Sequence, residues 1–314
     1  MRHDQLPNFI IIGAAKGGTT SLHAYLVQHP QIFMTSIKET NFFCKDSEFE
    51  RGLDWYLDFH FRGGEAYPFR GEASPRYLYS DQAPERMAGV FSDAPVRFLV
   101  VLRDPVERAY SWYWHLVRNG NETLGFEEAL ARESERLPVE AAKRIGSLRY
   151  AYVDSGMYAK QLRRWFEHFP SERFLVVLHE ELVTDTVAVL GQVFDFLGVT
   201  PQVDIDVTKR RNVASLPRSR VLQRAVLEVP VRVGKWVGPL LSRRAKDVLV
   251  RRYWAHAERI LRMNQRPFDK PDMNPDTEAR LRERFAEDIL DLQEILGRDL
   301  SGWLPRSSTG ENSA

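Results

Sequence analysis

The sequence predicts an α/β fold in which a doubly wound parallel sheet is flanked by helices. Short continuous apolar runs, helix-length segments between them and a glycine-rich turn after the first run together predict this fold. Continuous apolar runs are typical of parallel strands buried on both faces, and their alternation with helices favours a doubly wound sheet. The predicted strands are 8–13, 69–73, 97–102 and 173–179. The predicted helices are 19–29, 105–118, 126–134, 156–168 and 184–197.

Composition sets broad limits on the class of protein. The chain has 314 residues, of which 43% are hydrophobic, and a formal net charge of +1, which suits one large domain. No apolar run is long enough to span a bilayer, and the first residues lack the apolar core of a signal peptide. The single cysteine, Cys44, excludes an internal disulfide. We therefore expect a cytoplasmic protein.

The carboxyl-terminal third differs from the rest of the chain. We expect one domain over 1–304, a helical and basic region beyond Thr200, and a disordered polar tail over 305–314. The pattern over 273–296 predicts a closing amphipathic helix that starts at Pro275 and ends before a glycine.

Positive charge is concentrated in the segment 209–266, which holds sixteen Lys and Arg residues against three acids. One interpretation is solvated helix faces. The other is a wall of a binding cleft, with an anionic acceptor or a peripheral membrane contact as partner. Nucleic acid is a poorer interpretation, because no recognition motif accompanies the charge.

The glycine-rich turn after the first predicted strand is the strongest local signal. Such a turn directs backbone N–H groups at one point, and the helix that follows adds its positive dipole end, so the turn favours an anion. Gly13, Gly18 and Thr20 fit the spacing of a nucleotide-binding P-loop, so the sheet is P-loop-like. Thr19 stands where a P-loop carries its lysine, and Lys16 lies three residues earlier. Since the P-loop lysine serves the β- and γ-phosphates, the sequence argues against ATP or GTP.

A second anion site is predicted at the end of the strand 97–102. Arg103 follows the strand, Asp104 is a helix N-cap and Pro105 suits the first helical position. Ser111 lies about two turns along that helix. An arginine fork and a hydroxyl can together hold a phosphate, and ligands of open α/β sheets bind at the carboxyl ends of strands.

The segments 16–21 and 103–111 resemble the 5′-phosphosulfate loop and the 3′-phosphate motif of sulfotransferases, including the spacing Arg-x7-Ser. Those enzymes use 3′-phosphoadenosine 5′-phosphosulfate (PAPS). The resemblance covers the chain from about Asn8 to Leu304. It is closest to the branch of heparan-type carbohydrate sulfotransferases and their soluble bacterial relatives.

The resemblance implies roles for the residues of both motifs. Lys16 would stabilise charge on the leaving oxygen between phosphorus and sulfur. The residues expected to contact the 5′-phosphate are Lys16, Gly17, Gly18, Thr19, Thr20 and Ser21. Arg103 and Ser111 would hold the 3′-phosphate, although Arg103 also suits a structural ion pair. The heparan-type branch often has arginine at the position of Thr20, a difference that weakens one phosphate contact or alters acceptor preference.

The resemblance also implies a general base. Glu39 lies in a segment that is similar to the Glu-x-x-x-Phe stretch carrying the base in heparan-type enzymes, and its alternative is an ordinary surface residue. The stretch 71–77 resembles the acceptor-side loop. Glu72 and Tyr77 line an acceptor pocket there or simply pack at the strand end. Carbohydrate-specific relatives carry lysine at the position of Ala73, which argues against a heparan-like acceptor.

Two further positions complete the expected cofactor site. Tyr158 contacts the nucleotide or is an ordinary core tyrosine. Arg210 and Arg211 stand at the place of a basic loop that closes over the 3′-phosphate. No metal is expected, because a sulfonate carries less charge than a terminal phosphate and no cluster of His, Cys and Asp has metal-ligand spacing.

The sequence thus predicts a PAPS-dependent sulfotransferase that moves a sulfuryl group to an acceptor hydroxyl, with an amine as second choice, and releases PAP. A P-loop kinase or NTPase and a non-catalytic nucleotide-binding or membrane-associated module are the alternatives. The acceptor stays open among a sugar, a glycolipid, a polyketide-type metabolite and a phenol.

Overall fold

The structure is a computed structural model. It describes residues 5–142 without 93, then 149–200, 204–208, 215–219 and 264–305, together with scattered helical residues between 221 and 263. The chain divides into two compact units. The first comprises 1–112, 126–211 and 273–314, and the second comprises 113–125 and 212–272. The expectation of a single domain over 1–304 stays a prediction, and most of the predicted tail lies outside the described residues.

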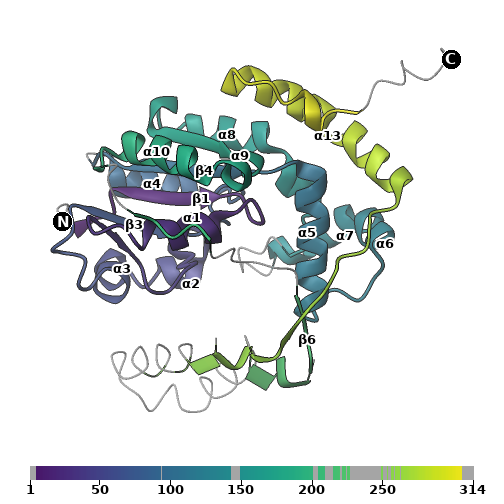
Figure 1. Ribbon diagram of the computed structural model, residues 1–314, viewed down its shortest axis with the longest axis horizontal. Helices are drawn as coiled ribbons and strands as arrows, with labels where there is room; N and C mark the ends of the chain where they lie inside the picture. Colours follow the sequence, from purple (N-terminus) through teal and green to yellow (C-terminus); the bar gives the residue numbers. More distant parts are fainter. Residues whose placement is uncertain are drawn as a thin grey trace. The chain divides into compact units, whose positions relative to one another are not determined.

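The first unit is built on a five-stranded sheet in which every pairing is parallel. The strands are β1 (Phe9–Gly13), β2 (Ile32–Met34), β3 (Phe69–Ala73), β4 (Arg97–Leu102) and β5 (Phe174–Leu178). Their order is β2-β3-β1-β4-β5, so the chain moves outward from β1 in both directions and the sheet is doubly wound (Figure 1). The four predicted strands are confirmed. β2 was not predicted, because its three residues are too few for a distinct apolar run.

Helices cover both faces of the sheet (Figure 1). One face of β1, through Phe9 and Ile11, packs in a buried cluster with α1 (Thr19–Leu26), α9 (His179–Thr184) and α10 (Thr186–Leu197). Side chains alternate along a strand, so Phe98 of β4 points to the other face. There its ring lies 5.2 Å from the ring of Trp165 in α8 (Tyr158–Phe166).

Further helices among the described residues connect the strands or follow them. They are α2 (Asp46–Phe49), α3 (Leu53–His60), α4 (Ala83–Phe91), α5 (Pro105–Arg118), α6 (Phe126–Ala131) and α7 (Glu133–Ala142). Short 3₁₀ turns occur at Phe42–Cys44, Asp154–Gly156, Ser171–Arg173 and Ser301–Trp303. The helix predicted over 105–118 is confirmed to the residue. The helices α2, α3, α4, α7 and α9 were not predicted.

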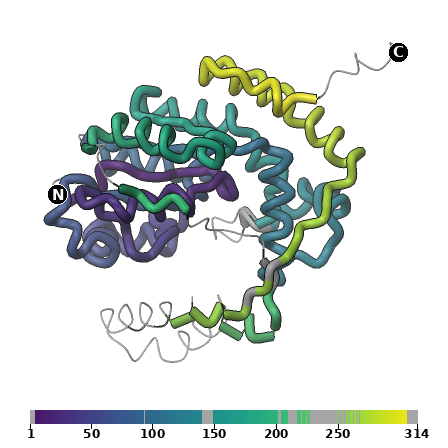
Figure 2. The backbone as a smooth tube through the Cα atoms, viewed as in Figure 1, coloured from purple at the N-terminus to yellow at the C-terminus, as the bar shows by residue number. Residues whose placement is uncertain are grey.

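The closing helix α13 (Pro275–Leu296) confirms the predicted start and end. The side chain of Asn274 accepts a hydrogen bond from the first turn, and Gly297 ends the helix with φ of +60°. The helix packs against α8, where Asp288 accepts from the backbone N–H of Ala159 at 3.1 Å and Asp291 pairs with Arg163 at 2.5 Å. Figure 2 shows this yellow helix beside the teal part of the chain.

The second unit contains an antiparallel pair, β6 (Ser215–Pro217) and β7 (Gln265–Pro267). Beside it the backbone N–H of Arg218 donates to the carbonyl of Asn264 at 2.6 Å. Most of the basic segment 209–266 lies outside the described residues, so its two interpretations stay open. Within the part of the chain that the structure describes, no helix is both long and apolar enough to traverse a lipid bilayer.

Candidate active site

The glycine-rich loop between β1 and α1 is fixed against the neighbouring strand β4. The backbone N–H of Ala14 donates to the carbonyl of Val101 at 2.8 Å. At Gly17 a Cβ atom would lie 2.1 Å from the same carbonyl oxygen, so any side chain would push the loop off the strand. Gly18 precedes α1 with φ of +114°, a conformation that glycine adopts without steric cost. These contacts explain why glycines occupy these two positions.

Lys16 and the start of α1 provide the charge and the donors of this loop. Lys16 has φ of +72°, which is uncommon for a residue with a side chain and often marks a functional turn. The first N–H groups of a helix have no partner within the helix, and Gly18 offers no side chain to cap those of Thr19 and Thr20, whereas the N–H of Ser21 donates to the carbonyl of Gly18 at 2.9 Å. The loop therefore presents backbone donors and a lysine at the carboxyl end of the central strand, as an anion site requires.

Arg103 follows β4, which is the next strand of the sheet. Its guanidinium pairs with Glu107 at 3.0 Å, so the ion-pair interpretation of Arg103 is confirmed for this structure. Asp104 caps α5 as predicted, accepting from the N–H of Val106 at 2.8 Å. Ser111 lies four residues after Glu107 and thus on the same helix face. The side chain of Arg103 therefore reaches the face of α5 that carries Glu107 and Ser111, and its contact and that of Ser111 with a 3′-phosphate stay predictions.

The side chain of Tyr158 binds the backbone of Arg103 from within the core. Its side chain is fully buried, and its hydroxyl donates to the backbone carbonyl of Arg103 at 3.0 Å. Burial raises the pKa of this phenol well above its ordinary value. These contacts agree with the core interpretation of Tyr158, and a contact with a nucleotide stays a prediction.

His179 contacts the glycine loop and was missed by sequence reasoning. Its Nδ1 lies 2.9 Å from the carbonyl oxygen of Gly17, and because a carbonyl only accepts, Nδ1 carries the proton. Burial lowers the pKa of His179, and the positive charge of Arg103 acts in the same direction. Its place directly after β5, at the carboxyl edge of the sheet, was the one signal in the sequence.

Glu39 is held at the end of β3 by its backbone. Its N–H donates to the carbonyl of Ala73 at 2.9 Å, its φ is +64°, and its own carbonyl accepts from the Asn41 amide at 2.7 Å. The carboxylate remains 46% exposed and pairs with Lys38 at 3.0 Å. This geometry leaves the carboxylate open to an approaching acceptor.

The pKa of Glu39 reflects two opposed effects. Partial burial would raise the pKa of this carboxyl. The charge and hydrogen bond of Lys38, with smaller contributions from Arg76 and Lys16, outweigh burial and hold the pKa below its ordinary value. Glu39 is therefore ionised at neutral pH, the state that a general base needs.

Glu72 of β3 lies next to the Glu39 segment, in a fully buried hydrogen-bond network. Its carboxyl accepts from the hydroxyls of Thr40 and Ser74 at 2.7 Å each, and from those of Tyr56 and Tyr77 at 2.7 and 2.9 Å. Burial raises the pKa of Glu72 in spite of these four donors. Since Glu72 and Tyr77 are both buried, strand-end packing is the interpretation that the structure supports, and the network anchors the residue next to Glu39.

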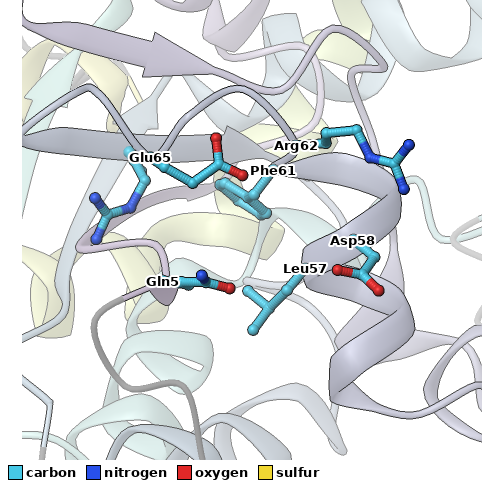
Figure 3. A pocket seen from close by; sticks show the side chains of 7 residues that line it. Gln5, Leu57, Asp58, Phe61, Arg62 and Glu65 are labelled. Carbon is cyan, nitrogen blue, oxygen red and sulfur yellow. The ribbon is translucent and has the colours of Figure 1, made fainter.

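A small surface pocket lies elsewhere on the first unit (Figure 3). It is lined by Gln5, Leu57, Asp58, Phe61, Arg62, Glu65 and Arg70. Arg70 is near the amino end of β3, whereas the predicted site lies at the carboxyl ends of the strands. The predicted residues Arg210 and Arg211 lie outside the described residues. No group of metal-ligating side chains is found among the residues that the structure describes.

Glu39, Lys16 and Arg103 thus lie at the carboxyl ends of three adjacent strands, β3, β1 and β4 respectively. A glycine loop without the P-loop lysine, with a strand-end arginine and a carboxylate on opposite neighbours of the central strand, is the arrangement that the resemblance to sulfotransferases led us to expect. The chain belongs to the sulfotransferase domain family, which matches residues 6–223.

The relatives agree with the predicted resemblance. The human bifunctional heparan sulfate N-deacetylase/N-sulfotransferase 3 is 34% identical over 207 residues, which are 63% of this chain and 23% of that protein. The human heparan sulfate glucosamine 3-O-sulfotransferase 3B1 is 33% identical over 195 residues, 62% of this chain and 47% of that protein. The chain therefore spans about a quarter to a half of the length of these relatives.

A solved structure matches over almost the whole chain. The sulfotransferase from Alicyclobacillus acidocaldarius is 29% identical with a TM-score of 0.68, covering 95% of this chain and 98% of that one. The predicted fold class and family are therefore confirmed.

Proposed function

We propose that this protein transfers the sulfuryl group of PAPS to an acceptor hydroxyl, with an amine as second candidate, by in-line displacement that releases PAP. The observation that carries the proposal is the meeting of Lys16, Glu39 and Arg103 at one edge of the sheet. The reaction needs an activated acceptor, a stabilised leaving group and a nucleotide that is held in place. Glu39, Lys16 and Arg103, respectively, carry charges that suit these needs.

Lys16 is proposed to stabilise the negative charge that develops on the oxygen between phosphorus and sulfur. It belongs to the loop whose backbone donors would bind the 5′-phosphate, so its ammonium would be close to the breaking bond. Arg103, whose side chain reaches Glu107 of α5, and Ser111, one turn further along that helix, would hold the 3′-phosphate. Fixing the nucleotide at both charged ends would orient the sulfuryl group toward the acceptor.

Glu39 is proposed as the general base. Its ionised and partly exposed carboxylate would take the proton of the acceptor hydroxyl as the oxygen attacks sulfur. The proton would go to Glu39, the sulfuryl group to the acceptor, and the bonding pair of the breaking S–O bond to PAP. No metal takes part in this scheme, and both metal independence and a cytoplasmic location stay predictions.

The acceptor class is proposed from the relatives only in coarse terms. Their names refer to heparan sulfate, which supports a carbohydrate acceptor, while a small molecule or a lipid stays open. Nucleic acid is not proposed as a partner.

Nucleotide selectivity tests the proposal against the kinase alternative. PAP should raise the melting temperature of the protein, whereas ATP with Mg²⁺ should not, because Thr19 stands where a kinase loop needs lysine. Incubation with ³⁵S-labelled PAPS and an extract of the source organism should then yield a labelled acceptor. Stabilisation by ATP with Mg²⁺ and not by PAP would favour the kinase.

A further inference from the structure

A charged side chain joins the carboxyl-terminal helix α13 to the residue that follows Arg103. The guanidinium of Arg282 donates to Oδ2 of Asp104 at 3.2 Å, although 178 positions separate the two residues. It also donates to the backbone carbonyl of Trp303 at 3.0 Å and pairs with Glu278 at 2.9 Å. The side chains of Arg282 and Asp104 are only 18% and 10% exposed. The pair is therefore largely shielded from water, where charge-assisted hydrogen bonds are stronger than at the surface.

The carboxylate of Asp104 has a different partner for each oxygen. Oδ1 accepts from the N–H groups of Val106 at 2.8 Å and Glu107 at 3.3 Å, and so caps α5. Oδ2 accepts from Arg282. Burial raises the pKa of Asp104, and the charge of Arg282 opposes that rise. Arg282 thereby favours the ionised carboxylate, which is the form that accepts from all three donors.

The peptide group between Arg103 and Asp104 is hydrogen-bonded on both sides. Its carbonyl, which belongs to Arg103, accepts from the hydroxyl of Tyr158 at 3.0 Å. Its N–H, which belongs to Asp104, donates to the carboxylate of Glu180 at 3.3 Å. Because a peptide group is planar, two opposed bonds fix its orientation, and the Asp104 side chain adds a third point of attachment. The backbone from which the Arg103 guanidinium extends is therefore firmly held.

The same carboxyl-terminal region also contacts the two helices that bind this peptide group. Asp288 of α13 accepts from the N–H of Ala159 at 3.1 Å, at the start of the helix α8 that carries Tyr158. Arg298, which follows α13, pairs with Glu181 of α9, the helix on the other side of the peptide. The segment 282–298 therefore contacts α5, α8 and α9, the three helices whose residues fix the backbone at Arg103.

We propose that Arg282 is a positioning residue for the 3′-phosphate site, and that its ion pair with Asp104 fixes the peptide group from which Arg103 extends. This inference rests on the proposed function, in which Arg103 holds the 3′-phosphate, and it adds the carboxyl-terminal helix to that site. Arg282 acts through Asp104 and does not contact the nucleotide. It therefore affects only the part of the affinity that depends on the 3′-phosphate.

Nucleotide selectivity provides the test. PAP and 5′-AMP differ only in the 3′-phosphate, so the Kd of 5′-AMP divided by the Kd of PAP isolates the contribution of that group. Calorimetry gives the Kd of PAP, and competition with PAP gives that of 5′-AMP. In Arg282→Gln this ratio should fall at least about fivefold, equivalent to about 1 kcal/mol, with the Kd of 5′-AMP within about twofold of wild type. Arg282→Lys keeps the charge without the planar fork and should recover part of the ratio.

Two further variants test whether Arg282 acts through Asp104. Asp104→Asn keeps a good N-cap residue and removes the charge that Arg282 contacts, so it should lower the ratio as Arg282→Gln does. The double variant should lose no more than either single variant, as expected for residues of one network. Arg163→Gln is the matched control, because it removes the 2.5 Å ion pair with Asp291 that also joins α13 to α8. It should keep the wild-type ratio.

The outcomes separate this inference from the proposed function. An unchanged ratio in Arg282→Gln, or additive losses in the double variant, overturns the positioning role and leaves sulfuryl transfer intact. Equal losses of affinity for both nucleotides assign Arg282 to general stability and also overturn it. If Arg282→Gln does not fold, an unchanged ratio in both Asp104→Asn and Arg282→Lys has the same meaning. A wild-type protein that binds PAP no more tightly than 5′-AMP contradicts the proposed function itself.

Discussion

Substitution of Glu39 by Gln is the sharpest test of the proposed chemistry. The change removes the negative charge and the ability to take a proton, yet preserves the size of the side chain. Glu39 is 46% exposed, and the ion pair that its side chain makes with Lys38 is a surface pair. Such pairs contribute about 0–1 kcal/mol, so the variant should fold with nearly unchanged stability. The backbone contacts that position residue 39 do not involve the carboxylate.

The substitution Glu39→Gln should lower the turnover number, kcat. General-base catalysis contributes about 10²–10⁴-fold, so kcat should fall at least about 100-fold, equivalent to ~2.7 kcal/mol of transition-state stabilisation. The assay is transfer of ³⁵S from PAPS, with PAP affinity by calorimetry and the melting temperature measured in parallel. PAP affinity should stay within about twofold of wild type.

Glu65→Gln is the matched control, because Glu65 lines the remote pocket of Figure 3. It should retain full activity. Turnover of Glu39→Gln within about threefold of wild type would refute the assignment of the base. A large loss of stability or of PAP affinity would show that residue 39 has a structural or nucleotide-binding role instead.

Two further predictions concern the same edge of the sheet. Lys38→Met removes the strongest influence that lowers the pKa of Glu39, so that pKa should rise. The acid limb of the pH profile of kcat/KM, where protonation of the base abolishes activity, should therefore move to higher pH, and an unmoved limb would contradict the electrostatic account. Gly17→Ala places a Cβ atom 2.1 Å from the Val101 carbonyl oxygen and should abolish PAP-induced thermal stabilisation. Gly89→Ala, where a Cβ meets no atom within 4 Å, is its control and should bind PAP as wild type does.

The central strands could be predicted because burial on both faces gives a continuous apolar signal that needs no tertiary context. Phe9–Gly13 is buried throughout, Arg97–Leu102 is buried apart from Arg97, and both strands were assigned within a residue. The three residues of β2 at the sheet edge carry no such signal. The six residues of α9 are likewise too few for a helical period to emerge.

The candidate site could be predicted only where local sequence fixes local geometry. The glycine turn and the capped start of α5 are of that kind. His179 is not, because its hydrogen bond joins it to Gly17 across 162 positions, and no local pattern encodes such a contact. The docking of the Glu39 segment on β3, through the Glu39 N–H and the Ala73 carbonyl, is likewise a contact between distant positions of the chain. The same docking buries Glu72, which the sequence could not distinguish from a pocket residue.

The attachment of the glycine loop to β4 has a consequence for ligand choice. Val101 holds the loop through Ala14, and Arg103 comes two residues later on the same extended backbone. At about 3.3 Å of rise per residue, Val101 and Arg103 are separated along the backbone by roughly 6.6 Å. The length of this stretch would therefore select nucleotides by the distance between their 5′- and 3′-phosphates, whichever base the ribose carries.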